Sequence, residues 1–277
     1  MSCHRRPLPD PSPVRCLLAF IAATALLACA GETDPPLGPG SLPDPVAVGV
    51  SISPSALSLI VGGAQSLTGR AYDAEDRTTN AIFEWSSADT AVAKVGKTNG
   101  VVFGIAPGTT TVTAAVGSLR ATASVNVWAE PAGLFDQWAI SATASSEYTA
   151  AEWSANQATG MPDVSRCADH PAAWASVEQA GVDWLELTYA EPVRPSVIRI
   201  HEVWGVGSIV KVEVKDLAGV YQTVYSAQPL DAKICPHILA IEVKDVTAMV
   251  SKVRVSVDQR LLNDWNEIDA VRLSGYR

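Results

Sequence analysis

The chain has 277 residues and a formal net charge of −9 at pH 7, with 29 Asp and Glu against 20 Lys and Arg. A chain this acidic is a poor candidate for binding nucleic acid or anionic lipid head groups through its own surface. An acidic surface is compatible with cation binding, although most acidic surfaces are simply solvated.

The N-terminal segment is typical of an export signal. Arg5, Arg6 and Arg15 come before an apolar run from Leu17 to Ala28, which is too short to span a membrane as a mature helix. We interpret residues 1–28 as a signal peptide.

The end of this segment reads Leu26-Leu27-Ala28-Cys29 and resembles the bacterial lipobox, in which a cysteine receives diacylglycerol and becomes the new N-terminus. The resemblance implies a lipid on Cys29, and acyl chains hold such a protein firmly on a membrane. By analogy with lipoprotein sorting, Ala30 implies the outer membrane or the cell surface. The alternative is a plain secretory signal with an incidental cysteine. Residues 29–45 are rich in Pro and Gly and are expected to form a tether.

Two cysteines, Cys167 and Cys235, remain in the body of the exported chain. Two cysteines in an oxidising compartment predict one disulfide. A zinc site is not expected, because no CxxC pair or suitably spaced histidine accompanies either residue.

Residues 46–128 are predicted to form an all-β sandwich. Short β-branched segments such as VAVGVSIS, AIFEWSS and TTTVTAAV alternate with Gly, Pro, Asn and Asp, and no helical period lies between them. Trp85 is expected to fill the core and Asp89 to cap a turn, while Gly100, Gly104 and Gly108 supply turn geometry.

The stretches VSISPSALSLIVGGAQSLTGRAYD, WSSADTAVAKV and GVVFGIAPGTTTVTAAV resemble the bacterial Ig-like domain of group 2 over nearly the whole length of this segment. The resemblance implies an Ig-like spacer or adhesion module.

Residues 131–277 are also predicted to be all-β, an antiparallel sandwich of jelly-roll type. The expected strands include WLELTYA, SVIRIHEV, IVKVEVKD, YQTVYSA, LAIEVKD, SKVRVSVD and DAVRLSG, and several alternate strictly between apolar and polar residues. This part resembles the galactose-binding-like superfamily, which includes discoidin domains and many carbohydrate-binding modules. The stretches QATGMPD, AWAS, WLELTYAEPV, VKVEVKDLAGVYQTVY and WNEIDAVRLSG resemble more closely the sandwich that accompanies pappalysin-type metalloproteases.

The superfamily resemblance implies a structural calcium ion held between a loop after the first strand and the start of the last strand. Calcium takes six to eight oxygen ligands, which two converging segments can supply. The implied ligands are Gln157, Asp163, Asp169, Asn266 and Glu267. The alternative is that Asp163 and Asp169 cap turns and that Glu267 pairs with an arginine.

A glycan-binding face is a further hypothesis, because sugars often stack on exposed aromatic rings. Trp204 ends a strand beside a Gly-rich loop, and with His201 and Tyr221 or Tyr225 it is the candidate ligand-binding group. Trp174 and Trp184 are expected to be buried as core residues.

Catalysis is not expected. The three histidines of the mature chain, His170, His201 and His237, form no H-E-x-x-H pair and are expected at the surface or in loops, and no G-x-S-x-G elbow or P-loop occurs. The sequence therefore predicts a lipid-anchored surface protein for binding or adhesion, whose partner is a glycan or another surface protein. The alternatives are an assembly subunit of a surface complex and, more distantly, a hydrolase.

Overall fold

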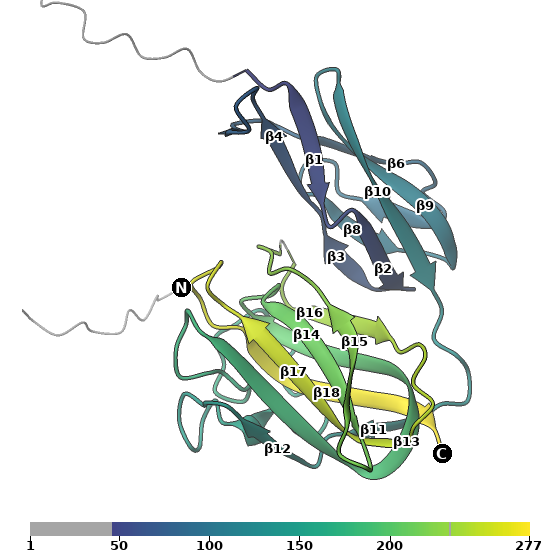
Figure 1. Cartoon of the computed structure of the whole chain (residues 1–277), viewed down its shortest axis with the longest axis vertical. Coiled ribbons are helices and arrows are strands. Elements are labelled where there is room, and N and C mark those ends of the chain that lie inside the picture. The colour runs from purple at the N-terminus through teal and green to yellow at the C-terminus, as the bar shows by residue number, and fades with distance from the viewer. Residues whose placement is uncertain (1–45, 233) are drawn as a thin grey trace, which may run out of the picture. The chain divides into compact units, whose positions relative to one another are not determined.

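The computed structural model describes residues 46–232 and 234–277 (Figure 1). The predicted signal peptide, the predicted lipidation site Cys29 and the whole of the predicted tether lie outside these residues. Within them, no helix is both long enough and apolar enough to cross a membrane.

The first sandwich contains ten strands in three small sheets. Their orders are β1-β4-β5, β2-β10-β9-β6 and β3-β8-β7, and only β2 and β10 pair in parallel. In chain order the strands are β1 (Gly49–Ser53), β2 (Ala56–Ile60), β3 (Ala64–Ser66), β4 (Thr68–Tyr72), β5 (Thr78–Thr79), β6 (Glu84–Ser87), β7 (Ala93–Val95), β8 (Val101–Gly104), β9 (Gly108–Val116) and β10 (Leu119–Trp128).

The residues expected to shape this sandwich do so. Trp85 is 6% exposed and packs in the core, and Asp89 caps a turn by accepting a hydrogen bond from the Ala91 amide at 2.9 Å. Gly100 has a φ of +69°, a conformation that residues with a Cβ resist. Gly104 is required for a different reason, because a Cβ there would lie 2.7 Å from the carbonyl oxygen of Ile60.

The second sandwich is built around one long strand, β13 (Val182–Trp204). Its N-terminal half pairs with β12 and β17, and its C-terminal half pairs with β16 and β18. The other elements are β11 (Phe135–Trp138), β12 (Ser141–Ala144), the 3₁₀ helix η1 (Ala155–Ala158), β14 (Ile209–Asp216), β15 (Tyr221–Ser226), β16 (His237–Glu242), β17 (Val250–Asp258) and β18 (Glu267–Tyr276).

Two layers result (Figure 1). One contains β11, β18, the C-terminal half of β13 and β16, and the other contains β12, the N-terminal half of β13, β17, β14 and β15. Alternation along the strands directs one face of each layer inward, where Leu185, Leu187, Ile198, Ile200 and Val253 are fully buried. The predicted all-β fold is confirmed.

The structure corrects one boundary. WLELTYA and SVIRIHEV were expected to be separate strands, but both belong to β13. The connecting residues include Pro192 and Pro195. Proline fixes φ near −65° and disfavours helical geometry in the residue before it, so the chain stays extended, with a register shift between Thr188 and Val193.

Candidate functional site

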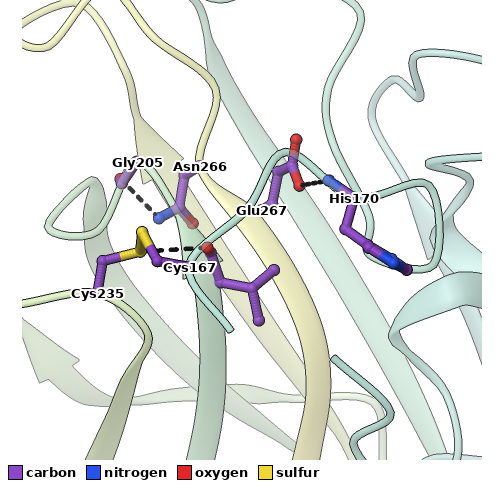
Figure 2. The surroundings of a disulfide bond; sticks show 7 residues. Cys167, His170, Gly205, Cys235, Asn266 and Glu267 are labelled. Carbon is purple, nitrogen blue, oxygen red and sulfur yellow. Dashed lines mark hydrogen bonds between the residues drawn. A yellow bond between two sulfur atoms is a disulfide. The ribbon is translucent and has the colours of Figure 1, made fainter. Parts of the chain in front are cut away.

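One end of the second sandwich brings together four segments that are distant in sequence: the loop 163–170, the end of β13, the loop before β16 and the start of β18. The disulfide between Cys167 and Cys235 ties two of them across a separation of 68 residues, as predicted from the cysteine count. The sulfur of Cys235 lies 3.2 Å from the carbonyl oxygen of Val203 in β13 (Figure 2). The disulfide therefore fixes the loops against the strand that carries His201 and Glu202.

A cavity of about 360 Å³ lies among these segments. Its polar lining comes from Asp163, Ser165, His201, Glu202 and His237, and its apolar lining includes Val203. The volume falls within the roughly 300–1,000 Å³ of typical small-ligand pockets. We take this cavity as the candidate functional site.

Glu202 anchors a buried polar network at the floor of the site. Its side chain is 2% exposed, and its oxygens lie 2.8 Å from Nδ1 of His237 and 2.9 Å from the amide nitrogen of Asn266, which donates to it. Burial alone would lower the pKa of His237, but the hydrogen bond and the charge of Glu202 outweigh burial and raise that pKa above its usual value. His237, expected at the surface or in a loop, instead begins β16, is 9% exposed and holds the carboxylate in place.

His201 was predicted from the sequence to be a ligand-binding residue, and its side chain lines the cavity. It lies on β13 and contacts the Trp138 ring edge-on, with ring centroids 5.5 Å apart. Burial lowers the pKa of His201 to about 4, and the nearby charges of Arg199 and Arg272 act in the same direction. The imidazole is therefore neutral at pH 7 and offers one N–H donor and one nitrogen acceptor.

The other aromatic residues of the predicted binding group lie elsewhere. Trp204, expected to be the most exposed, is half-buried and pairs with Glu267 in the register of β13 and β18. Tyr221 belongs to β15 in the opposite layer, where its hydroxyl bonds to Glu186. Tyr225 packs against the core, and burial raises its pKa to about 12. His201 and Tyr221 therefore do not form one face.

The predicted calcium ligands each form hydrogen bonds with different protein groups. Asn266 donates to Glu202 and to the Gly205 carbonyl oxygen, whereas Glu267 accepts the His170 amide hydrogen at 2.8 Å. Figure 2 shows these two neighbouring side chains pointing in different directions. Glu267 also shares a hydrogen bond with Asp169.

The remaining two predicted ligands are also engaged. The side-chain amide of Gln157 donates to the Ala151 carbonyl oxygen at 2.8 Å. The Asp163 amide donates to Asp269 at 3.4 Å, and the Asp163 carboxyl interacts with the same residue. Over residues 46–232 and 234–277, no three His, Cys, Asp or Glu side chains gather in a metal-binding group. The five residues as placed do not fit a calcium site, and calcium binding stays a prediction.

Gly205 holds the turn next to the cavity. Its φ is +54°, and a Cβ there would lie 1.8 Å from the carbonyl oxygen of Trp265. We expect Gly205→Ala to lower the free energy of unfolding by about 3 kcal/mol, because both backbone strain and a backbone clash oppose the methyl group. Gly133→Ala is the matched control, since Gly133 has a φ of +77° and nothing within 4 Å of the added carbon. Urea unfolding of both variants measures the difference, and equal losses would contradict the clash.

Comparisons with known proteins identify both sandwiches. The model of the family named Bacterial Ig-like domain (group 2) matches residues 46–127. The model of the family named Pappalysin-1, SD scarf domain, C-terminal matches residues 129–277. These matches confirm both predicted resemblances. No curated protein matches the chain.

Several solved structures are similar in fold. Domains 4 and 5 of the S-layer protein SbsC are 22% identical, with a TM-score of 0.28; the match covers 30% of this chain and 53%, about half, of that chain. Chitosan-binding module 1 of a chitosanase/glucanase from Paenibacillus sp. IK-5 is 20% identical over 49% of this chain and 94% of that one, with a TM-score of 0.36. An F5/8 type C domain from Bacteroides fragilis is 14% identical over 53% and 99%, with a TM-score of 0.40.

The scarf-domain model matches more than half of the chain, and the chain therefore belongs to the family named Pappalysin-1, SD scarf domain, C-terminal.

Proposed function

We propose that the chain is a non-catalytic, lipid-anchored surface protein whose second sandwich binds a glycan in the cavity beside His201. The first sandwich, similar to bacterial Ig-like domains, serves as a spacer. The lipobox-like stretch that ends at Cys29 supports the anchor. The observation that supports the binding proposal is the cavity of about 360 Å³ whose polar lining includes His201, Glu202 and His237.

The chemistry of the lining suits a neutral sugar. A sugar presents hydroxyl groups that both donate and accept hydrogen bonds, and neutral His201 can do both. Trp138, in contact with His201, adds an aromatic surface next to the cavity. Glu202 is already bonded to His237 and Asn266, so it orients these groups rather than acting as a free acid or base.

The loops that border the cavity are held in place without a ligand. The disulfide Cys167–Cys235 fixes the two loops that border the cavity, and the network of Glu202 fixes its floor. A site that is already ordered loses less conformational entropy on binding.

The test is a glycan array followed by calorimetry on the purified full-length chain. We expect a neutral glycan to bind and His201→Phe to weaken its binding about tenfold, equivalent to about 1.4 kcal/mol. Phenylalanine preserves the ring contact with Trp138 but removes both hydrogen-bonding nitrogens, so the melting temperature should change little. Lys244→Gln, at an exposed ion pair with Glu242, is the control. Binding that is unchanged in His201→Phe would place the site elsewhere, and silence of the folded chain toward all glycans would contradict the function.

A further inference from the structure

The outer face of the layer that contains Tyr221 carries aromatic and positively charged side chains. Inward residues Leu185 and Leu187 are fully buried, so Trp184 and Glu186 project outward from β13. The strand registers place Glu186 opposite Arg254 and Arg254 opposite Glu213. The side chains that point outward therefore form a row across four adjacent strands, β13, β17, β14 and β15 (Figure 1).

Arg254 is held rigidly at the centre of this face. Its guanidinium carbon lies 4.5 Å from the Trp184 ring centroid and 4.3 Å from the Tyr221 ring centroid. Its Nε and Nη2 donate to the same Glu186 oxygen at 3.1 and 2.8 Å. Two cation–π contacts and a forked ion pair leave the side chain little rotamer freedom.

The charges on the face are layered. The carboxylates of Glu186 and Glu213 are 8% and 14% exposed, whereas the side chains of Lys211 and Lys252 are 44% and 37% exposed. Lys215, on β14, lies with its ammonium nitrogen 4.7 Å from the Tyr221 ring centroid. The carboxylates therefore form the floor and the ammonium groups reach the solvent.

The face is consequently a cationic surface on an acidic protein. Four cations, Lys211, Lys215, Lys252 and Arg254, stand over the carboxylates of Glu186 and Glu213, while the whole chain has a net charge of −9. The third carboxylate of these rows, Asp258 at the end of β17, is paired with Arg260 at 2.7 Å. A local excess of one charge on a protein of the opposite charge attracts ligands of complementary charge.

We propose that this face, centred on Arg254, binds a polysaccharide that carries carboxylates, such as a chain of uronic acids. Lys211 and Lys215 are four residues apart on one strand, about 13 Å, so a ligand that contacts both is a chain rather than a single sugar. The outward hydroxyl residues Thr143, Thr223 and Ser256 lie in the same rows and complement the hydroxyl groups of a sugar. The site lies on the layer opposite to that of His201 and does not depend on the cavity.

Polygalacturonate is the probe, and binding to the full-length chain is measured by calorimetry at low and at raised ionic strength. We expect Lys211→Gln combined with Lys215→Gln to weaken binding at least about tenfold, because two exposed cations are lost from the contact. Lys244→Gln combined with Arg277→Gln removes the same net charge elsewhere in the sandwich and should change binding less than about twofold. Raised salt should weaken binding by the wild-type chain.

Arg254→Lys tests the centre of the site. It keeps the charge but loses the planar fork and the stacking between the rings, so binding should fall even where the melting temperature is unchanged. Equal losses in the two double variants would overturn the proposal, and so would equal binding of fully methyl-esterified polygalacturonate. Binding to phosphatidylglycerol vesicles without binding to polygalacturonate would assign the face to a membrane and overturn it too. His201→Phe should leave polygalacturonate binding intact, which separates this result from that of the cavity.

Discussion

Replacing Cys167 and Cys235 together with alanine is expected to lower the free energy of unfolding by about 4 kcal/mol in the chain-entropy model. The bond closes a loop across a separation of 68 residues, so its loss releases a large conformational freedom in the unfolded chain. For a sandwich of this size the melting temperature should fall by roughly 10 °C. Thermal and urea unfolding of the oxidised chain measure both quantities.

The same change should also loosen the cavity. Without the bond, the loop 163–170 is held to β18 by the amides of Asp163, Val164 and His170, which donate to its carboxylates. It is held to β13 by the Ala168 amide, which donates to the Val203 carbonyl oxygen at 3.1 Å. Reduction of the wild-type chain is the matched control and should reproduce the melting temperature of the double variant. A double variant as stable as the oxidised wild-type chain would contradict the expected contribution of the bond.

The buried and exposed faces of the strands could be predicted from the sequence, because the alternation of apolar and polar residues is a local pattern. Alternation in VKVEVKD and SKVRVSVD directs Val212, Val214, Val253 and Val255 into the core, and all four are fully buried or nearly so. The disulfide followed from the count of cysteines in an exported chain. Neither inference needs knowledge of which strands pair.

The same alternation determines the direction in which Trp184 points. Leu185, Leu187 and Tyr189 point inward, so Trp184 must point outward, and its expected burial in the core is wrong: it is half-buried beneath Arg254. Asn266 directly precedes β18 and Glu267 begins it, and their side chains bond to different partners, Glu202 and the His170 amide.

The remaining features depend on contacts between distant segments. The cavity requires β13, the loop 163–170 and the loop before β16 to meet, and the pair of Glu202 and His237 is formed by residues on two different strands. The contacts of Tyr221 with Glu186 and Arg254 likewise depend on the strand order β13-β17-β14-β15. No single-sequence pattern states which strands are neighbours, so the sequence placed Tyr221 with His201.

Glu267 is expected to make the stability of the second sandwich strongly dependent on pH. The side chain is 2% exposed. Burial raises the pKa of its carboxyl from 4.5 to about 8; the His170 amide opposes this rise and Asp169 adds to it. Because the folded-state pKa is the higher one, the contribution is fully present below about pH 4.5 and is lost as the pH rises through 8. Once the pH is above both the unfolded-state pKa of 4.5 and the folded-state pKa of about 8, the total loss of stability is on the order of 5 kcal/mol.

Glu267→Gln removes this dependence because glutamine remains neutral. The variant should be close to the wild-type chain at pH 5 and clearly more stable at pH 9, as measured by urea unfolding across this range. Asp136→Asn, at an exposed carboxylate, is the control and should leave the wild-type slope in place. A wild-type stability that is flat between pH 5 and 9 would contradict the assignment of a buried, protonated Glu267.

The same unfolding measurements are then repeated with calcium. A cation bound by Glu267 and Asp169 would favour their ionised forms, so calcium would stabilise the wild-type chain most at pH 8 and would not stabilise Glu267→Gln. Stabilisation of that kind would show that the loops rearrange around the ion into the predicted site. If calcium has no effect at pH 8 while the pH slope persists, a protonated Glu267 that is hydrogen-bonded to Asp169 holds the loop 163–170 to β18.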